Sequence, residues 1–465
     1  MSKIDYSNYQ SVFSWRYGSP EMREIFSEAN KYRLWRRIWV EMARLQSKQG
    51  LVKSEELEDL ESNQENINIE RILEIEKETG HDVVAAIREF AEVAKVGGGK
   101  IHLGATSMDI VDNADSIRAK EALVIIEDKL IKLLKNFSEK IEKYADLPCM
   151  AYTHLHPAEP TTLGYRFALY GQDLLWDLNK IKWLMEEGIK SKGFKGAVGT
   201  QASYQKLMGE KVVDFENELM EKLGLKTVLI SGQTTPRKID YLISTVLSSI
   251  AQSLNKFAFD LRILQSPNFG EVSEPFGKTQ VGSSSMPFKK NPVKSEQICS
   301  LARLVINLSK TADENAANSL LERTLDDSAN RRVYMPEMFL CIDEILNSAT
   351  KIISGLVVNE AKIQENLERY APFAATEEVI IEAVKRGANR QEMHEILREI
   401  SMEAWSLVSV GEENPMLDLL MKREEVLKYV GKEKLEKIID PENHLGTAPV
   451  RAKKLVNEIK KAISS

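Results

Sequence analysis

The sequence predicts an all-α protein whose centre is a bundle of long helices. Long helical patterns cover residues 115–145, 161–190, 236–266, 292–320 and 332–356. The first of these has neither glycine nor proline, and as one continuous helix it spans about 45 Å. Alternation of apolar and polar residues, which is typical of strands, is absent over any useful length. Helices of matched length with apolar residues on more than one face favour a bundle that associates with further copies of the chain.

The composition narrows the class of protein. The chain has 465 residues, enough for more than one domain, and 29% of them are charged, as in globular proteins. The net charge of -7 disfavours a general affinity for nucleic acids or membranes. The N-terminus has no signal-peptide pattern and no apolar run reaches membrane-spanning length, so we expect a cytoplasmic protein. The widely spaced Cys149, Cys299 and Cys341 indicate thiols in a reducing compartment rather than a disulfide framework or a metal site.

The N-terminal part predicts a helix over residues 21–49, preceded by Arg16 and Tyr17. An arginine and a tyrosine just ahead of a helix suit a phosphate group, which accepts charge-assisted hydrogen bonds. The alternative is a capping turn with an ordinary surface arginine. From the local pattern alone, the capping turn is the stronger interpretation.

Two polar pairs precede the first long helix. Among the shorter helices predicted over residues 55–96, the adjacent His81 and Asp82 have the pattern of a polar helix cap. Farther along, Thr106 and Ser107 stand where the long helix starts, and hydroxyl residues at such a position are usually N-caps. The local pattern therefore predicts a structural role for both pairs.

The link between the first two long helices contains two histidines. Residues 146–166 hold three prolines, which predict an irregular connection. His154 and His156 stand two residues apart, a spacing that also suits metal ligands. No cysteine or acidic set of suitable spacing accompanies them, so a structural role is the stronger interpretation from the pattern alone.

Residues 277–297, GKTQVGSSSMPFKKNPVKSEQ, interrupt the helical pattern. Glycine and two prolines exclude a regular helix or a central strand, and Pro292 suits the first turn of the helix that follows. The N-terminus of that helix supplies free N–H groups and partial positive charge, to which the segment adds serine hydroxyls and two lysines. Such a loop suits a small dianion such as a dicarboxylate. An ordinary basic surface loop is the alternative.

The segment GSSSMPFKKNP in this loop resembles the GSSxMPxKxNP signature of the aspartase/fumarase superfamily, whose members eliminate fumarate from a succinyl-bearing substrate. HLGATSMD resembles another segment shared by that superfamily. Further segments resemble the adenylosuccinate lyase family: RYGSPEM, GHDVV, THLHPAEPTT, KGAVGTQAS, SGQTTPRK and LERTLDDSANRR. The resemblance covers nearly the whole chain. One departure is Gly80, because many members of the family have an arginine ahead of the histidine.

The resemblance implies an all-α, three-domain fold of the aspartase/fumarase type that assembles into a homotetramer around a shared core of long helices. The expected domains are an N-terminal helical domain over 1–111, a central long-helix domain over 112–364 with the signature loop, and a C-terminal helical domain over 365–465. The implied reactions, in purine nucleotide biosynthesis, are cleavage of adenylosuccinate to AMP and fumarate and of the ribotide SAICAR to AICAR. These small molecules are the expected partners. Neither a cofactor nor a metal is required, because protein groups hold the carbanion.

The resemblance also assigns roles to individual residues. Ser283 acts as the base that removes the proton beside a carboxylate, and Lys289 helps to stabilise the carbanion. His154 protonates the departing purine nitrogen, and Glu296 pairs with this histidine and orients its ring. The residues at substrate-binding positions are Arg16, Tyr17, His81, Asp82, Thr106, Ser107, Thr153, Gln233, Ser284, Asn291, Arg323, Ser328 and Arg332, with His156 lining the pocket.

Two other classes of protein share part of this pattern. Argininosuccinate lyase shares the superfamily segments, but only a nucleotide substrate needs phosphate binders such as Arg16 and the arginines of LERTLDDSANRR. A structural protein that kept the lyase scaffold is the second alternative, and the joint presence of Ser283, Lys289 and His154 speaks against it. Without the resemblance, LERTLDDSANRR would be interpreted as a solvated helix face.

Overall fold

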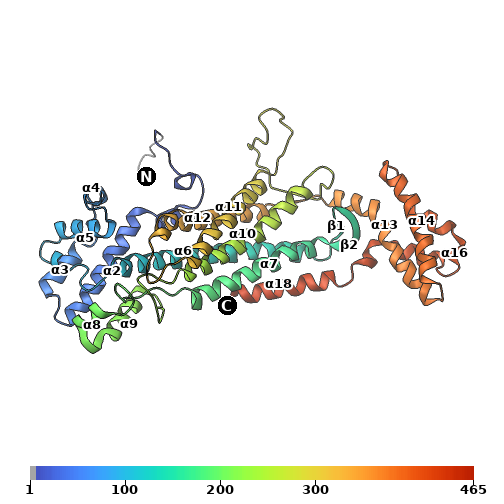
Figure 1. Cartoon of the computed structure of the whole chain (residues 1–465). Coiled ribbons are helices and arrows are strands. Elements are labelled where there is room, and N and C mark those ends of the chain that lie inside the picture. Colours follow the sequence, from blue (N-terminus) through green and yellow to red (C-terminus); the bar gives the residue numbers. More distant parts are fainter. Residues whose placement is uncertain (1–6, 465) are drawn as a thin grey trace. The chain divides into compact units, whose positions relative to one another are not determined.

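The computed structural model describes residues 7–464 and is almost entirely helical (Figure 1). The residues cluster into two compact units. Unit 1 consists of the residues up to 129, 177–252 and 300–346, and unit 2 consists of 130–176, 253–299 and 347–465. The all-α prediction is confirmed, whereas the predicted domain boundaries after residues 111 and 364 remain a prediction.

Five long helices have residues in both units. They are α6 (Ser107–Lys143), α7 (Leu163–Trp183), α10 (Lys238–Leu264), α11 (Val293–Ala317) and α12 (Asp326–Ser354), with the π-helical turn η3 (Leu184–Gly188) directly after α7. Each long helix overlaps one of the five predicted patterns, which confirms that the apolar periodicity marks helices here. The last of them begins at Asp326 rather than near residue 332, so Ser328 lies on a helix.

The N-terminal part of unit 1 contains α2 (Glu28–Lys48), which has 21 residues, and several shorter helices. The shorter helices of this unit are η1 (Val12–Ser14), α1 (Pro20–Ile25), α3 (Ser54–Ser62), α4 (Ile69–Thr79), α5 (Asp82–Val93), η2 (Gly98–Lys100), α8 (Ala202–Met208), η4 (Gly209–Lys211) and α9 (Val212–Leu223). The single helix predicted over 21–49 is divided, because Ser27 caps α2 by accepting a hydrogen bond from the N–H of Asn30 at 3.1 Å. A serine at this position satisfies an N–H group that the helix leaves unpaired.

Ion pairs join three long helices within unit 1. The Nε of Arg331 on α12 donates to Asp240 on α10 at 2.7 Å, and its Nη1 lies 3.4 Å from Asp115 on α6. Lys129 and Asp343 form a further ion pair between α6 and α12. Because one guanidinium reaches two neighbouring helices, the three helices are held in a defined register around it.

Unit 2 contains a β-hairpin where an irregular connection was predicted. The strands β1 (Pro148–Thr153) and β2 (His156–Thr162) pair in antiparallel fashion. Prolines are tolerated here because each strand of a two-stranded hairpin has a free edge that needs no N–H donor. The turn residues His154 and Leu155 have φ angles of 55° and 65°. A two-residue hairpin turn requires this left-handed conformation, which costs a residue other than glycine roughly 1–2 kcal/mol.

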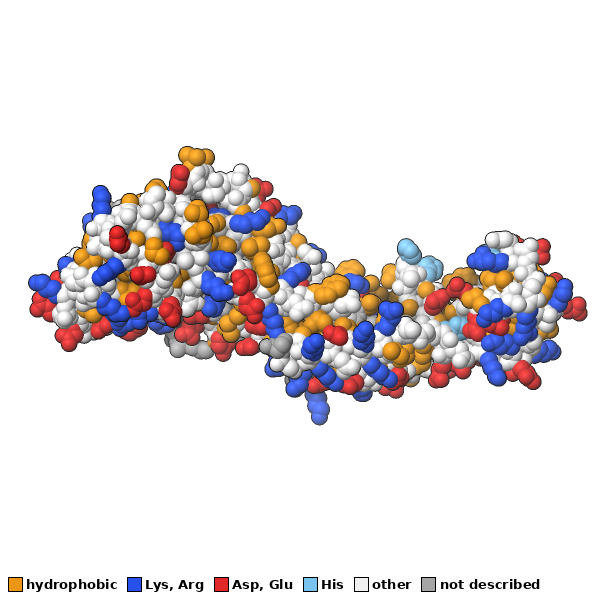
Figure 2. Space-filling model, turned by 90° about the horizontal axis from the view of Figure 1, so that it is seen from below, with side chains coloured by type: hydrophobic (Ala, Val, Ile, Leu, Met, Phe, Trp, Pro, Cys, Tyr) orange, Lys and Arg blue, Asp and Glu red, His pale blue; other side chains and the backbone are white. Residues whose placement is uncertain are grey.

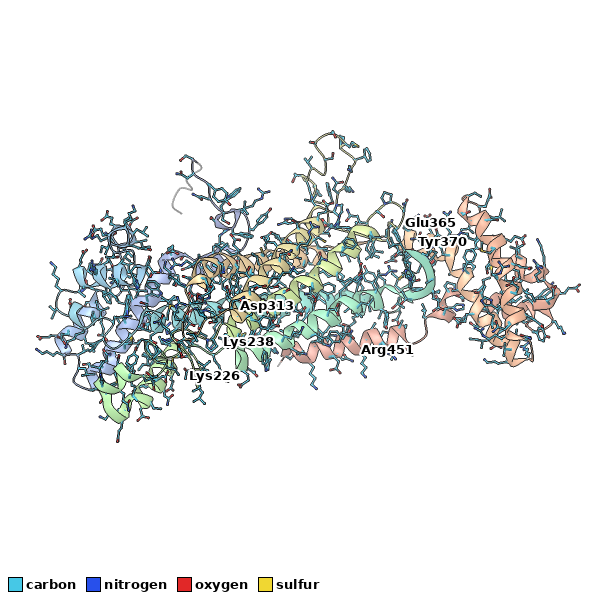
Figure 3. All side chains as sticks on the ribbon, viewed as in Figure 1. Lys226, Lys238, Asp313, Glu365, Tyr370 and Arg451 are labelled. Atoms are coloured by element: carbon cyan, nitrogen blue, oxygen red, sulfur yellow. The ribbon has the colours of Figure 1, made fainter. Side chains whose placement is uncertain are left out.

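Aromatic side chains join three long helices within unit 2. Phe137 on α6 and Tyr170 on α7 pack against Phe257 on α10, with distances between ring centres of 5.1 and 5.4 Å. The other elements of this unit are β3 (Val272–Ser273), β4 (Val357–Val358), α13 (Glu360–Lys385), α14 (Arg390–Ser409), α15 (Met416–Lys422), α16 (Glu424–Leu427), α17 (Lys432–Ile438), η5 (Pro441–His444) and α18 (Ala448–Ser464). Tyr370 on α13, labelled in Figure 3, packs against Trp405 on α14 in the C-terminal part of the unit.

Hydrophobic side chains are exposed at several places among the charged ones (Figure 2). Along α7, Leu169, Trp176 and Trp183 follow one another at intervals of seven residues, and each is at least half exposed. A spacing of seven puts all three on one face of the helix, which leaves a stripe of apolar surface for another protein surface to cover. Within residues 7–464, no helix combines the length and the apolar character needed to cross a membrane.

Candidate active site

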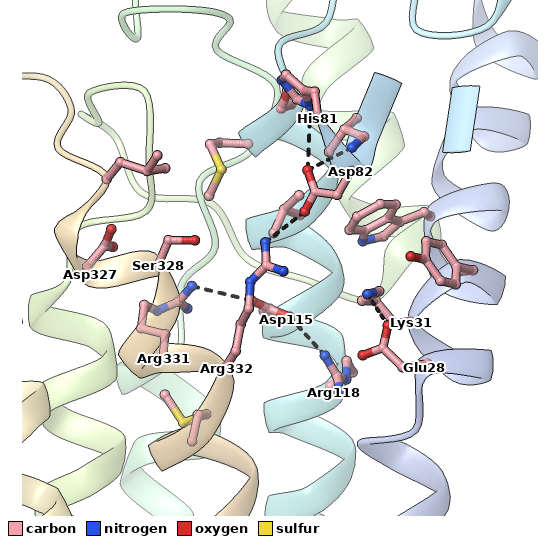
Figure 4. Close-up of a pocket in the computed structure, with 18 of the residues that line it drawn as sticks. Glu28, Lys31, His81, Asp82, Asp115, Arg118, Asp327, Ser328, Arg331 and Arg332 are labelled. Carbon is pink, nitrogen blue, oxygen red and sulfur yellow. Dashed lines mark hydrogen bonds and ion pairs between the residues drawn. The ribbon is translucent and has the colours of Figure 1, made fainter. Parts of the chain in front are cut away.

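A pocket of about 620 Å³ lies within unit 1 (Figure 4). Eight of the residues predicted to bind substrate line it: His81, Asp82, Thr106, Ser107, Gln233, Arg323, Ser328 and Arg332. They come from segments far apart in the sequence, so the fold alone brings them together. A concave pocket with converging polar side chains is the expected place for a small ligand.

Two helices begin at one wall of the pocket. His81 is the N-cap of α5 and accepts a hydrogen bond from the N–H of Val84 at 3.5 Å, and Asp82 is the first residue of this helix. Thr106 precedes α6, and its backbone N–H donates to the Asp109 carboxylate at 3.0 Å. The predicted cap at His81 is therefore confirmed, whereas a hydroxyl cap by Thr106 or Ser107 remains a prediction, and all four of these side chains line the pocket. Helix N-termini present N–H donors and partial positive charge, which suits an anionic ligand.

Arginine and serine side chains at and just before the start of α12 also line the pocket. Ser328 and Arg332 lie on the first turns of α12, and Arg323 lies just before it. Arg332 donates to Asp82 at 2.8 Å, and 61% of its side chain is exposed. The backbone N–H of Gln233 donates to the carbonyl of the residue before Arg323 at 2.9 Å, so the two loops lie side by side. Guanidinium and hydroxyl groups in this arrangement suit phosphate or carboxylate oxygens.

The charges of the pocket are nearly balanced. Six arginine and lysine side chains and five carboxylates line it. Within residues 7–464, every one of these basic side chains has a carboxylate oxygen no farther than 3.4 Å away. The pocket therefore offers an anionic ligand the directed N–H groups of the more open Arg323 and Arg332 rather than a large excess of positive charge.

Several basic residues of the pocket were not predicted from the sequence. They are Lys31, Arg118, Arg237 and Arg331. Lys31 pairs with Glu28 and Arg118 with Asp115, each three residues earlier on the same helix. This spacing is common on solvated helix faces, so it gives no sign of a pocket. Arg237 belongs to the segment SGQTTPRK, where the resemblance pointed to Gln233 alone.

A neutral histidine stands behind the α6 wall. The indole N–H of Trp39 donates to Nδ1 of His102 at 3.0 Å. Burial lowers the pKa of His102 to about 4, although Asp109 acts in the opposite direction. The imidazole is therefore uncharged at neutral pH and able to accept this hydrogen bond. His102 lies in the HLGATSMD segment, which is the only sign of its position that the sequence offers.

Arg16 and Tyr17 are not among the described residues that line the pocket. They precede α1, and the Arg16 guanidinium carbon lies 5.7 Å from the ring centre of Tyr17. Ser19 caps α1, and its N–H donates to Asp343 at 2.6 Å. The capping turn thus describes the local structure, and a phosphate contact of Arg16 remains a prediction.

The predicted general acid lies in unit 2, at the turn of the hairpin. Thr153, His154 and His156 are exposed around this turn, and Glu296 is exposed on the first turn of α11. In the described part of the chain, no ion pair joins His154 to Glu296. Their pairing therefore stays a prediction. Residues 7–464 contain no group of three or more His, Cys, Asp or Glu residues placed to hold a metal ion.

The predicted base lies on the signature loop of unit 2, which joins β3 to α11. The Ser283 hydroxyl oxygen accepts a hydrogen bond from the N–H of Met286 at 3.1 Å. Ser284 and Lys289 are exposed on the same loop. A backbone donor at the serine oxygen favours its ionised form, which a base requires.

The base of the signature loop is closed by close backbone packing. The Asn291 side chain donates to the carbonyl of Gly282 at 2.9 Å. A Cβ atom at Gly282 would lie 2.0 Å from the carbonyl oxygen of Lys289. Only glycine permits this approach, so Gly282 and Asn291 fix the loop that carries Ser283.

Comparison with known proteins first defines the class of protein. The family model described as "Lyase" matches residues 16–307, and the model described as "Adenylosuccinate lyase C-terminus" matches residues 372–455. A fumarate lyase structure from Mesorhizobium sp. BNC1 is 25% identical with a TM-score of 0.84, covering 97% of this chain and 99% of that one. The structure of 3-carboxy-cis,cis-muconate lactonizing enzyme from Pseudomonas putida is 26% identical with a TM-score of 0.86, covering 98% and 100%. The chain thus has the all-α fold of these enzymes.

Closer relatives define the family. An adenylosuccinate lyase from Saccharomyces cerevisiae is 39% identical over 463 residues, covering 98% of this chain and 95% of the relative. An adenylosuccinate lyase from Methanocaldococcus jannaschii is 38% identical over 455 residues, covering 97% and 95%. The chain belongs to the adenylosuccinate lyase family of carbon–nitrogen lyases. The family resemblance found in the sequence is confirmed.

Proposed function

We propose that the chain cleaves adenylosuccinate to AMP and fumarate, and SAICAR to AICAR, in purine nucleotide biosynthesis. The observation that carries this proposal is the pocket of unit 1, where eight predicted substrate-binding residues line one cavity. The relatives from Saccharomyces cerevisiae and Methanocaldococcus jannaschii, which cover nearly the whole chain, are named for this substrate. The runner-up, argininosuccinate, lacks the phosphate that the arginines of α12 would bind.

The substrate carries one phosphate and two carboxylates, and the pocket offers groups for each. Arg323, Ser328 and Arg332 bind the phosphate and succinyl ends through directed donors. Thr106 and Ser107 bind a substrate carboxylate at the N-terminus of α6, where the helix dipole adds to the attraction. His81, Asp82 and Gln233 contact the nucleotide, and Arg16 and Tyr17 its phosphate.

The chemical step is a proton transfer followed by loss of the purine nitrogen. Ser283 takes the proton from the carbon beside a carboxylate, and the electron pair left on that carbon forms the double bond of fumarate. The carbon–nitrogen bond breaks, and His154 gives its proton to the departing nitrogen. The extra negative charge of the intermediate is stabilised by Lys289, Asn291 and backbone N–H groups of the signature loop. Each acid–base group contributes roughly 10²–10⁴ to the rate.

A complete site takes residues from more than one chain of a homotetramer. His154 is exposed and Ser283 is not buried, as expected for side chains that complete a site on another copy. Apolar side chains are also exposed on the loops that carry Gln233 and Arg323. They are Leu229, Ile230, Leu320, Leu321 and Leu325, each at least 64% exposed. A copy of the chain that covers these residues, together with the apolar stripe of α7, would bring its own catalytic groups to the pocket.

We propose that the domains extend over 1–111, 112–364 and 365–465, with the signature loop in the central domain. The protein works in the cytoplasm on small molecules, and no nucleic acid or membrane takes part. The reaction uses protein groups without a metal or cofactor.

One assay tests the proposal. Purified protein is incubated with adenylosuccinate, and its loss is followed by absorbance while fumarate is measured separately. Argininosuccinate serves as the control substrate. We expect rapid release of fumarate from adenylosuccinate and none from argininosuccinate. Intact adenylosuccinate, or a preference for argininosuccinate, would overturn the proposal.

A further inference from the structure

We infer that Asp112, Arg237 and Asp327 form a buried relay that positions the substrate-binding side chains of the pocket, an inference that rests on the proposed function. Arg237 lies in the middle of the relay. Its Nη1 donates to the Asp112 carboxylate on α6 at 3.2 Å, and its Nε donates to Asp327 on α12 at 2.5 Å. No more than 3% of any of the three side chains is exposed. The three residues thereby link two helices and the loop before α10.

Each end of the relay holds a segment that carries predicted substrate-binding residues. The Asp112 carboxylate also accepts a hydrogen bond from the N–H of Thr235 at 2.6 Å, two residues after Gln233. Asp327 directly precedes Ser328 and accepts from Arg323 Nη1 at 3.4 Å. Asp112 does not line the pocket, whereas Arg237 and Asp327 do. A shift of either carboxylate would therefore move the groups that meet the substrate.

The buried charges of the relay suit the positioning of pocket residues better than the stabilisation of the fold. Burial of charged groups is expensive, and buried ion pairs contribute little net stability compared with apolar packing. Burial opposes the charge of Asp112, but Arg237 and Arg331 outweigh this effect and hold the pKa of the carboxyl below its usual range. Asp112 is therefore ionised at neutral pH and keeps all of its hydrogen bonds. What the arrangement supplies is a fixed distance between three segments of the pocket.

The chain contains a matched control for this relay. Arg36 and Glu89 form another buried ion pair in unit 1, with side chains 2% and 1% exposed. Arg36 also donates to the backbone carbonyl of Asn63 at 2.6 Å. Neither residue of this pair lines the pocket. The Arg36–Glu89 pair thus has the same kind of charged groups and the same burial as the relay but does not adjoin the pocket.

The experiment compares Asp112→Asn with Glu89→Gln. For Asp112→Asn we expect KM for adenylosuccinate to rise roughly ten- to hundredfold while kcat changes less, because binding groups are displaced and the catalytic groups are not. Hydrogen exchange should become faster in residues 231–237 and 320–328. Glu89→Gln should lower the melting temperature but leave KM and the exchange of these segments unchanged. Arg237→Lys, which keeps the charge without the fork of N–H donors, should reproduce the rise in KM if Asp112→Asn does not fold.

The outcomes are distinguishable. If Asp112→Asn and Glu89→Gln change KM equally, or if exchange in residues 231–237 and 320–328 stays as in the wild type, the relay does not position the pocket. If the wild type releases no fumarate, the proposed function fails. The exchange experiment needs no substrate and still decides whether the relay holds these segments.

Discussion

Ion pairs hold the pocket of unit 1, whereas a few backbone hydrogen bonds hold the signature loop of unit 2. In the pocket, Arg237 and Arg331 are each in contact with two or more carboxylates, and their side chains are 2% and 11% exposed. On the loop, Ser284 and Lys289 are exposed, and Ser283 accepts hydrogen bonds from neighbouring N–H groups. The two regions are therefore built for different tasks.

This difference suits the proposed function, in which the pocket of unit 1 binds the substrate and the loop and hairpin of unit 2 supply the acid and the base. In the proposed function, the prearranged pocket fixes the nucleotide, because its side chains are in place before the ligand arrives. The groups proposed to move protons lie on an exposed loop and an exposed hairpin turn, where the left-handed His154 shows a local conformational cost typical of functional sites.

Removal of the catalytic groups should affect the rate and not the fold. Ser283→Ala and His154→Ala should each lower kcat by roughly 10²–10⁴, with a melting temperature near that of the wild type because neither side chain is buried. The measurement is fumarate release together with thermal unfolding. Ser285→Ala, which removes a neighbouring exposed hydroxyl, is the control. Near-normal turnover by either of the first two variants would contradict their assignment as base and acid.

Mixing two inactive variants should restore activity if the two regions meet between chains. Arg323→Ala damages the pocket and Ser283→Ala damages the loop. In randomly mixed tetramers, about a quarter of the sites would receive both intact regions, because each is drawn from a different chain. Activity is measured after joint refolding, with sedimentation to check the tetramer. No recovery in verified mixed tetramers, or full activity in a monomer, would place both regions of a site on one chain.

The loop should tolerate a methyl group at one glycine and not at another. Gly282→Ala brings Cβ to 2.0 Å from the Lys289 carbonyl oxygen, so the base of the loop must open. We expect kcat to fall roughly tenfold or more, with little change in stability because the loop is exposed. Gly277→Ala is the matched control, since its Cβ meets only the Gln280 side chain at 3.7 Å. Equal activity of the two variants would show that the closed base is unimportant.

The smallest expected effect is the loss of protein stability at acidic pH that results from protonation of His102. The pKa of His102 is about 4 in the folded protein and 6.5 in a free side chain, so folding keeps the imidazole neutral. The contribution of the neutral imidazole to the free energy of unfolding is present above pH 6.5 and is lost as the pH falls from 6.5 to 4. In His102→Asn, the Oδ1 of the new side chain can accept the hydrogen bond from Trp39. The melting temperature of this variant should therefore fall less between pH 6.5 and 4 than that of the wild type, by a few degrees. An unchanged pH dependence would show that His102 does not titrate as described.

The local signals of the sequence predicted the long helices well. Apolar periodicity acts over a few turns, so α6, α7, α10, α11 and α12 appear where the pattern predicted them. The division at Ser27 and the hairpin around His154 were not predicted. In the first case one serine hydroxyl outweighed a continuous apolar pattern, and in the second the prolines suggested a break, although a two-stranded hairpin accepts them.

The site was predicted in part. Eight substrate-binding residues share the pocket, because the motifs that carried them were specific. Arg237 and Asp112 were not predicted, although they lie within or beside those motifs. The reason is that these two residues pair with each other across 125 positions in the chain. An arginine that pairs across such a separation has no local pattern that distinguishes it from a surface arginine.

By itself, the sequence determined which segments are helices, which loop interrupts them and which family the chain belongs to, because each of these depends on neighbouring residues. Only the tertiary structure decided that Asp82 meets Arg332, that Arg237 joins two helices and that His154 adopts a left-handed turn. Those facts depend on side chains brought together by packing of distant helices, and the burial that makes such charges matter exists only once the chain has folded.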